Sequence, residues 1–456
     1  MDRRYFWLLT LLSLPAYFGL LYVTPRTEWE WLLGLFGILF LLYAIQLHVL
    51  RLSSSKRIDK TAASLPIRDL LIAGVLVRIF AYAALPELTD DYFRFIWDGR
   101  LWHQGINPFA ALPESYMQDS KQAEAMGLTQ ELFEGLNSPR FYTIYPPVLQ
   151  AIFWLATAIF PKSIYGSVLV MKAFGLLAEL ASLYLLDRLL KRFQLPRHYL
   201  ALYALNPLVV VELSGSLHFE ALMIAFVLGS IYLLSSSQPQ AWWQSALLFG
   251  LAVATKLLPL MFLPLMIRRL GWVKAIGYGA IAMGLTALMF LPIFDLETLT
   301  NLSQSIDLYF HRFEFNASLY YVIRWLGFEF YGRNVIKSVG TWLALAAMLS
   351  ILIYVWLERK PSFHNLSNGM LWTSALYLLC ATVVHPWYGT PLIAWATLGK
   401  YRWPILWSAL LPLSYFTYRS LDYTEDLGLV ALAYIPSILF LVYEVWKKGS
   451  SKAQTA

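Results

Sequence analysis

Residues 29–50 read WEWLLGLFGILFLLYAIQLHVL, an almost unbroken apolar run. A helix needs about 20 such residues to cross the ~30 Å hydrocarbon core of a bilayer. Similar runs recur along the chain, in which 59% of the residues are hydrophobic and only 14% are charged. Because only helices and closed barrels satisfy all their backbone hydrogen bonds in lipid, and these runs have helical length, the sequence predicts an all-α polytopic membrane protein.

The basic residues predict which end of each span faces the cytoplasm. The formal charge is +7, but the lysines and arginines are spread through short loops, which is typical of membrane topology and not of nucleic-acid binding. With Arg3 and Arg4 inside, spans near 5–23, 29–50 and 67–87 place residues 88–145 in a large outer loop. We expect both termini in the cytoplasm, since the tail ends in Lys447 and Lys448.

Residues 146–160 are apolar but short for a crossing. If they crossed together with 164–187, Arg188, Lys191 and Arg192 would lie outside, so we interpret 146–160 as re-entrant or interfacial. The rest of the chain then alternates, with a second large outer loop at 295–335. The single domain, 1–456, would hold roughly 13 or 14 transmembrane helices. The further outer turns are expected near 212–220, 255–256, 385–388 and 419–426, and the inner turns near 235–240, 268–274, 358–360 and 400–402.

The first outer loop opens with LTDDYFRFIWDGRLWHQGINPF, residues 88–109. Residues 90–103 are predicted to form a helix that starts at Thr89 or Asp90 and stops before Gly105. Its interleaved aromatic rings and arginines favour an amphipathic helix in the membrane interface, where guanidinium groups meet phosphates. Two interpretations of Asp90 and Asp91 stay open. In the first, Asp90 caps the helix and Asp91 pairs with Arg94. In the second, one of the two is a catalytic base and the other is its attendant carboxylate.

Further ionisable residues stand at predicted membrane depth or at the outer rim, where such groups usually face a cavity or each other. Lys172 and Glu179 lie two turns apart and are predicted to form a structural pair. Lys256 lies between two short apolar runs, and we favour its binding an anion over its reaching out to solvent. The remaining candidates are Glu212, His218, Glu220, His311, Arg312 and His385.

Several of these strings resemble a known family. The most specific is Trp97-Asp-Gly-Arg100 with Gly105-Ile-Asn-Pro-Phe109, and the others are Ile144-Tyr-Pro-Pro147, Asn206-Pro207 with His218-x-Glu220, Thr255-Lys256 and His385-Pro-Trp-Tyr388. Together they are similar to the GT-C-fold glycosyltransferases that use polyprenyl-phosphate sugar donors, and among them to the bacterial mannosyltransferases. The chain departs from that pattern in having two extra spans before the acidic pair and His218-Phe-Glu220 in place of an Asn-Asp.

The resemblance implies an inverting transfer of a hexose, with mannose first, to an acceptor hydroxyl at the outer face of a bacterial plasma membrane. The acceptor could be a glycan, a lipid or a protein. Either Asp90 or Asp91 would be the base. The lipid phosphate leaving group needs cations, which Arg94, Arg100, His103, Lys256, His311 and Arg312 could supply. The cavity would be lined by Tyr145, Glu212, His218, Glu220, His385, Trp387 and Tyr388.

Metal use and two alternative functions stay open at this point. Asp90 and Asp91 with His103 or His218 could hold Mg²⁺ or Mn²⁺, although no ligand spacing requires a metal. A lipid or polysaccharide transporter would also need a polar cavity, but its ionisable residues should spread through the depth of the spans. A polyprenyl-linked oligosaccharide ligase or polymerase should have large loops dominated by arginines and not by an acidic pair.

Overall fold

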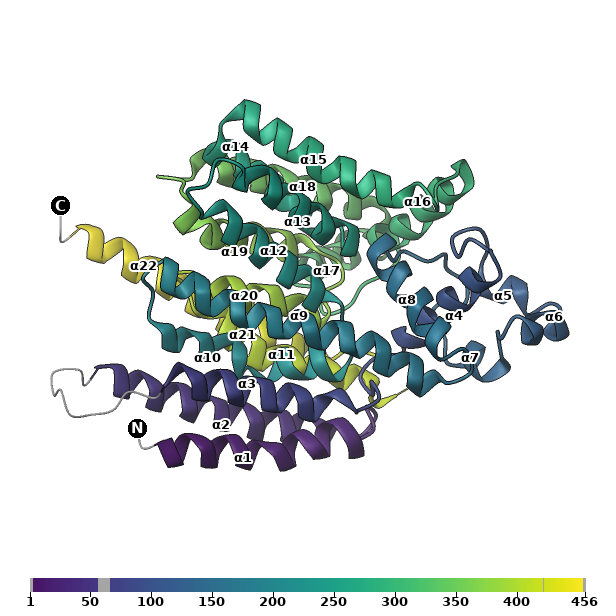
Figure 1. Ribbon diagram of the computed structural model, residues 1–456, viewed down its shortest axis with the longest axis horizontal. Helices are drawn as coiled ribbons and strands as arrows, with labels where there is room; N and C mark the ends of the chain where they lie inside the picture. The colour runs from purple at the N-terminus through teal and green to yellow at the C-terminus, as the bar shows by residue number, and fades with distance from the viewer. Residues whose placement is uncertain (1–2, 56–65, 421, 454–456) are drawn as a thin grey trace.

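The computed structural model describes residues 3–55, 66–420 and 422–453. Figure 1 shows long helices lying side by side in layers, with small helices gathered at one end. The elements of the N-terminal half are α1 (Arg3–Phe18), α2 (Trp29–Ser55), α3 (Ile67–Tyr82), α4 (Asp91–His103), α5 (Pro113–Tyr116), α6 (Ser120–Ala125), α7 (Gln130–Glu134), α8 (Pro147–Ile159), α9 (Ile164–Arg192), α10 (Ala201–Ala204), α11 (Pro207–Val209) and α12 (Glu220–Leu234). The remaining helices are α13 (Ala241–Thr255), α14 (Leu263–Leu270), α15 (Trp272–Phe290), α16 (Leu296–His311), α17 (Leu319–Tyr331), α18 (Ile336–Leu357), α19 (Leu366–Cys380), α20 (Thr390–Leu398), α21 (Trp403–Leu410) and α22 (Leu427–Ala453).

Fewer helices than predicted are long and apolar enough to cross a membrane. In the described part of the chain there are six, Arg3–Val23, Trp29–Arg51, Ile164–Arg192, Trp272–Phe290, Ile336–Leu357 and Leu427–Lys448. A seventh would be the pair Pro207–Gly215 and Glu220–Leu234, which is bent by 112°. The all-α polytopic class is confirmed, but the predicted count of roughly 13 or 14 transmembrane helices is not.

Prolines explain much of the difference in count. Pro207, Pro259, Pro264, Pro391 and Pro404 each stand in the first turn of a new short helix. The missing N–H of proline costs nothing there, whereas inside a helix it would break a backbone hydrogen bond. Several apolar runs that the sequence predicts as single spans are therefore successions of short helices.

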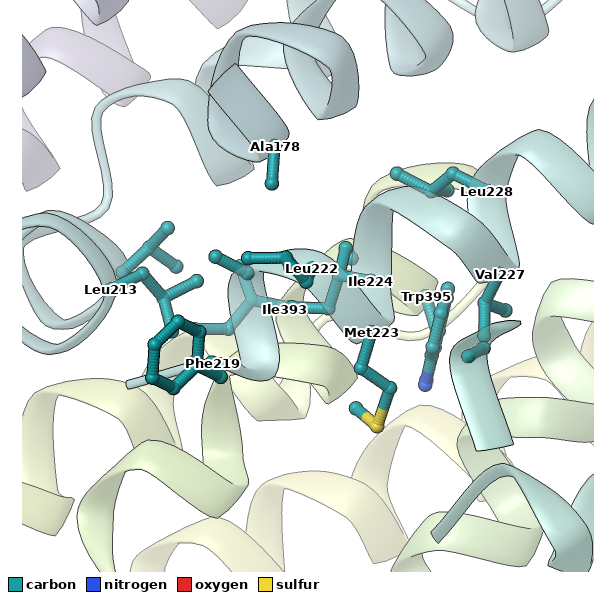
Figure 2. Close-up of a cluster of buried hydrophobic side chains, with 14 of the residues drawn as sticks. Ala178, Leu213, Phe219, Leu222, Met223, Ile224, Val227, Leu228, Ile393 and Trp395 are labelled. Atoms are coloured by element: carbon teal, nitrogen blue, oxygen red, sulfur yellow. The ribbon is translucent and has the colours of Figure 1, made fainter. Parts of the chain in front are cut away.

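The core is built around α12. Figure 2 shows Leu222, Met223 and Leu228 of this helix among side chains from α9 and α20, which contribute Ala178 and Trp395. The chain around the start of α12 is buried without interruption from residue 200 to residue 224. The bend before α12 is therefore enclosed by protein and can carry polar groups at a depth that lipid would not tolerate.

Contacts between segments at or next to the loops join regions that the sequence predicts on the same side. Predicted inner turns meet each other in the pairs Arg192–Tyr232, Arg269–Glu358 and Arg402–Glu444. Predicted outer segments meet in the pairs Arg26–Asp90, Asn107–Ile293, Glu220–Lys256 and Asn316–Val384. In Figure 1, α1 begins and α22 ends at one end of the helices, and α4 to α7 lie at the other.

Helix α8 touches the first outer loop along its length. Gln150 near its start donates to Asp98 of α4 at 2.9 Å, and Thr157 near its end lies 3.1 Å from His103. Gly99 permits this close packing, because a Cβ at that position would stand 2.4 Å from the carbonyl oxygen of Phe153. These contacts agree with the interpretation that residues 146–160 do not cross the membrane.

Two buried cations hold the middle of the fold. Arg78 of α3 pairs with Glu179 of α9 at 2.8 Å, and neither side chain is exposed. Lys172 donates to the carbonyl oxygens of Ala81, Ala84 and Gly215 at 2.9, 2.6 and 3.0 Å. The predicted Lys172–Glu179 pair is therefore wrong, because groups from other elements satisfy both side chains.

We expect Arg78→Met to destabilise the protein by about 3–5 kcal/mol, because it leaves the Glu179 carboxylate buried without its cation. The measurement is thermal unfolding of the purified protein in detergent. The matched control is Arg197→Ala, which breaks a pair whose arginine is 43% exposed and should cost about 1 kcal/mol or less. Equal shifts for the two variants would contradict the structural role of Arg78.

Candidate active site

Helix α4 forms as predicted, but protein encloses it. Residues 94–101 are all buried, so the helix does not present the exposed interfacial face that the sequence predicts. Arg94 pairs with Asp98 at 2.8 Å, and not with Asp91. At the helix start the Asp91 amide donates to the Thr89 hydroxyl at 3.2 Å, while Asp90 makes no capping bond through its side chain. The interpretation of the two aspartates as cap and Arg94 partner therefore fails.

The two adjacent aspartates have different partners. Asp90 pairs with Arg26 at 2.7 Å, whereas Asp91 accepts a hydrogen bond from the Asn137 amide at 2.8 Å. Burial raises the pKa of Asp91 above its ordinary value, an effect opposed by the Asn137 hydrogen bond and the positive charge of Lys256 and reinforced by Asp90 and Glu220. Asp91 thus lies within electrostatic reach of Lys256 and Glu220, although these residues come from a distant part of the sequence.

The bend before α12 brings two buried carboxylates to the same region. Glu212 lies in the turn Val210–Gly215, accepts a hydrogen bond from the Tyr415 hydroxyl, and has Oε2 3.4 Å from His218 Nε2. Glu220 begins α12 and pairs with Lys256, whose side chain is 23% exposed while that of Glu220 is fully buried. Lys256 follows the last residue of α13 in extended conformation, so its ammonium group reaches the start of α12.

Stacked rings cover one side of these charges. His218 stacks on Trp387 with centroids 3.8 Å apart, Trp387 on His385 at 4.2 Å, and His385 on Phe315 at 4.8 Å. Burial, followed by the nearby Lys256 charge, lowers the pKa of His385 to about 3. The ring is therefore neutral at physiological pH, which suits a place within an aromatic stack.

An apolar cavity adjoins Lys256. Leu258 follows Lys256 by two residues and Met223 follows Glu220 by three, and both line the cavity together with Tyr388. The ring of Tyr388 also lies 5.9 Å from the Lys256 ammonium group. The remaining lining residues are Met261, Phe262, Ser374, Tyr377, Leu378, Pro391 and Leu392. A charged group thus stands beside a small recess lined mainly by apolar side chains.

The structure brings together eight predicted site residues, Asp91, Glu212, His218, Glu220, Lys256, His385, Trp387 and Tyr388. Asp90 is adjacent in sequence but is engaged with Arg26. The other predicted residues contact partners elsewhere. These contacts are Arg94 with the carbonyls of Ser138 and Phe141, Arg100 with that of Gly127, His103 with that of Trp154, His311 with Asp307 and Thr341, and Tyr145 with the rings of Phe95 and Phe153. Arg312 is exposed just after α16.

Sequence reasoning missed Arg26, Asn137, Tyr415 and Tyr418. Arg26 pairs with Asp90 and lies over the ring of Tyr418 at 5.2 Å. Arg26 stands in the first predicted outer turn. A basic residue there is an exception to the positive-inside rule, and this exception could have marked Arg26 as a functional residue. Asn137 and Tyr415 contact their acids across 46 and 203 residues of sequence, so no local pattern could mark them.

The carboxylates and histidines do not fit a metal site. Among the described residues, no group of three or more His, Cys, Asp and Glu side chains is placed to hold an ion. His103 stands twelve residues after Asp91 on one helix, which separates them by roughly 18 Å at 1.5 Å per residue. Asp90 is bound by Arg26 and His218 lies beside Glu212, so the predicted Mg²⁺ or Mn²⁺ ligands form no metal site in the described part of the chain.

These helices and this enclosed acid–lysine site define a multi-pass membrane protein with one candidate catalytic centre. The family model described as "Alpha-(1->6)-mannopyranosyltransferase, N-terminal domain" matches residues 24–272. The match covers more than half of the chain, which therefore belongs to this family, the MptA_B family, and is a membrane glycosyltransferase of mannosyltransferase type. A search of curated proteins found no significant match. The matched region holds Asp91, Glu212, His218, Glu220 and Lys256, whereas the ring stack beyond His218 lies outside it.

Proposed function

We propose that the protein transfers a mannosyl group from a polyprenyl-phosphate donor to a hydroxyl of a glycan acceptor, with inversion at the anomeric carbon. One observation carries the proposal. Lys256 pairs with the buried Glu220 at the start of α12, stands beside a small apolar recess, and its charge acts on Asp91. A base, a cation and an apolar surface for a lipid are the three parts that this reaction needs. The printed name of the family supports an α-(1→6) linkage in the product.

Asp91, and not Asp90, is the proposed base. The acceptor hydroxyl loses its proton to the carboxylate as its oxygen attacks the anomeric carbon. Asp90 is engaged in a direct ion pair with Arg26, which leaves its carboxylate less free to contact an acceptor hydroxyl. Asp91 has a raised pKa and a neutral partner, Asn137, so it accepts a proton more readily.

Lys256 is the proposed partner of the donor phosphate. As the bond between the anomeric carbon and the phosphate oxygen breaks, its electron pair leaves on the phosphate, and a fixed cation stabilises the charge that develops. In the structure Lys256 is paired with Glu220, so the phosphate would exchange for this carboxylate. The side chains of Leu258, Met261 and Tyr388 beside Lys256 would contact the first part of the polyprenyl chain.

The transferred sugar would lie between Lys256 and the ring stack. Within the described part of the chain, Glu220 Oε2 and His385 Nδ1 are buried and have no hydrogen-bond partner. Buried polar atoms are normally paired, because an unpaired one costs about 1–3 kcal/mol. Both residues are close to Lys256, so the hydroxyl groups of a hexose bound there could satisfy them.

We further propose that the site faces the outer side of the plasma membrane within one membrane domain, 1–456. The segments 88–145 and 295–335 contact each other, for example through Asn107 and Thr298 at 2.8 Å, and the first of them carries Asp91. The start of α1, the end of α22 and the contact of Arg402 with Glu444 lie toward the opposite end of the helices. The positive-inside rule then places the termini in the cytoplasm.

The direct test is transfer of radiolabelled mannose from polyprenyl-phosphate mannose to membranes of the native host by the purified protein. Polyprenyl-phosphate glucose and a nucleotide-linked mannose serve as comparison donors. Labelled glycan formed only with the polyprenyl mannose donor is the expected result. Labelling from the nucleotide sugar alone, or no labelling from any polyprenyl sugar, would overturn the proposed donor.

The pH dependence of transfer provides a second test. Since the base must be deprotonated, kcat/KM should rise with pH through the pKa of Asp91, and its midpoint should lie above the ordinary value of 3.8 because burial raises that pKa. Asn137→Ala removes a hydrogen bond that lowers this pKa, so the acid limb should move to higher pH. A pH–rate profile of both proteins measures the shift. A shift to lower pH, or none, would argue against Asp91 as the titrating base.

A further inference from the structure

A short segment of the second outer loop closes the ring stack. The Phe315 amide donates to the Thr382 carbonyl at 3.0 Å, and the Val384 amide donates to the Phe315 carbonyl at 2.8 Å. The Asn316 side chain also donates to the Val384 carbonyl at 3.1 Å. This pairing sets the ring of Phe315 on that of His385. The position of the stack therefore depends on where the backbone at residues 315 and 316 is held.

Glu425, just before α22, holds that backbone. Its carboxylate accepts a hydrogen bond from the backbone N–H of Asn316 at 2.6 Å and another from the Tyr321 hydroxyl. The Tyr434 hydroxyl donates to the Asn316 carbonyl at 2.7 Å. Asn316 is fully buried and has a φ of 46°, a conformation that residues other than glycine adopt infrequently. Surrounding groups must therefore keep it there.

We propose that Glu425 is a positioning residue of the transferase site, acting through Asn316 and Phe315 on the stack of His385, Trp387 and His218. The inference rests on the proposed function. His218 is in turn 3.4 Å from Glu212, and Lys256 acts electrostatically on both His218 and His385. Releasing Phe315 would loosen the rings that define the wall next to Lys256. Misplacement of a wall by about 1 Å can slow an enzyme by as much as about 100-fold.

The first part of the test compares Glu425→Ala with Glu425→Gln. We expect Glu425→Ala to lower kcat by about 10- to 100-fold, while Glu425→Gln retains most activity because its amide oxygen can still accept from Asn316. Burial raises the pKa of Glu425 to about 7, so a neutral side chain is a close substitute. The matched control is Glu314→Ala, which removes the Arg324 and Tyr320 contacts of the same loop and should leave kcat within about twofold.

The second part is a double-mutant cycle with Phe315→Ala. If Glu425 acts through Phe315, the double variant should lose no more activity than the larger single loss, because coupled residues are not additive. A double variant whose loss of activity equals the product of the two single losses would overturn the proposal. Full activity of Glu425→Ala would overturn it as well. If Glu425→Ala does not fold, the cycle is run with Glu425→Asp. The shorter side chain of aspartate should also lose the hydrogen bond from the backbone N–H of Asn316. An inactive wild type would count against the proposed function itself, whereas an active wild type with an insensitive Glu425 would count against this inference alone.

Discussion

Asp91→Asn should lower mannose transfer by about 100- to 10,000-fold, the usual contribution of a general base. The substitution keeps the size of the side chain and its ability to accept the hydrogen bond from Asn137. It removes only the capacity to take a proton. The measurement is kcat/KM with radiolabelled polyprenyl-phosphate mannose, at a pH well above the acid limb of the wild type. Donor KM should change little, since Asp91 is not proposed to bind the phosphate.

Asp90→Asn is the matched control for this loss. Asp90 is the neighbouring residue and is similarly placed at the start of α4, but it pairs with Arg26 at 2.7 Å. We expect a loss of about tenfold or less, because a partly exposed ion pair contributes roughly 1 kcal/mol or less. A larger loss for Asp90→Asn than for Asp91→Asn would reverse the assignment. Full activity of both variants would remove the acidic pair from the reaction.

The sequence predicted the fold best where the signal is local. The starts of α2 at Trp29 and α9 at Ile164 coincide with the starts of apolar runs, although both helices extend beyond the predicted ends, and the start and stop of α4 follow from Thr89 and Gly105. The sides of the loops, predicted from the positions of arginine and lysine, stay a prediction. The number of spans failed because prolines such as Pro207 and Pro391 start new helices within apolar runs, and a protein-enclosed chain tolerates such breaks.

The sequence could not predict which ionisable side chains pair with each other, because the partners come from distant segments. Arg94 could reach Asp91 or Asp98 on the same helix. It pairs with Asp98 in a buried group that Thr143 and Gln150 complete from outside α4. Lys172 and Glu179 likewise meet partners from other elements. A one-dimensional pattern identifies which residues are costly to bury, but the packing decides which of them meet.

Only part of the candidate site could be predicted, because the sequence shows which residues are costly to bury but not which of them meet. Glu220, Lys256 and His385 were found because each is an ionisable group within an apolar region, and the structure brings them together. Arg94, Arg100 and His103 have the right charge, but they are engaged within the first outer loop. Asn137 and Tyr415 carry no such signal, since amides and phenols are ordinary on a protein surface. Their roles appear only when the carboxylates that they contact are located.

Removing the Lys256 cation should have the second largest effect. Lys256→Met alone would leave Glu220 buried without a partner, which is strongly destabilising. The variant to test is therefore the double substitution Lys256→Met with Glu220→Gln, which removes both charges together. We expect kcat/KM to fall by about 100- to 1,000-fold, the usual cost of losing one preorganised group that stabilises the transition-state charge. Steady-state kinetics with varied polyprenyl-phosphate mannose provide the measurement.

Glu220→Gln alone is the control that separates the cation from its partner. It keeps Lys256 and frees it from its carboxylate, so the phosphate no longer has to displace Glu220. We expect this single variant to keep kcat/KM within about tenfold of the wild type, since a hydrogen bond to the sugar is worth about 1 kcal/mol. The double variant should lose far more, although both proteins carry the same change at position 220. Equal losses would assign the effect to Glu220, and Lys256 would then be a structural counter-ion and not the partner of the donor phosphate.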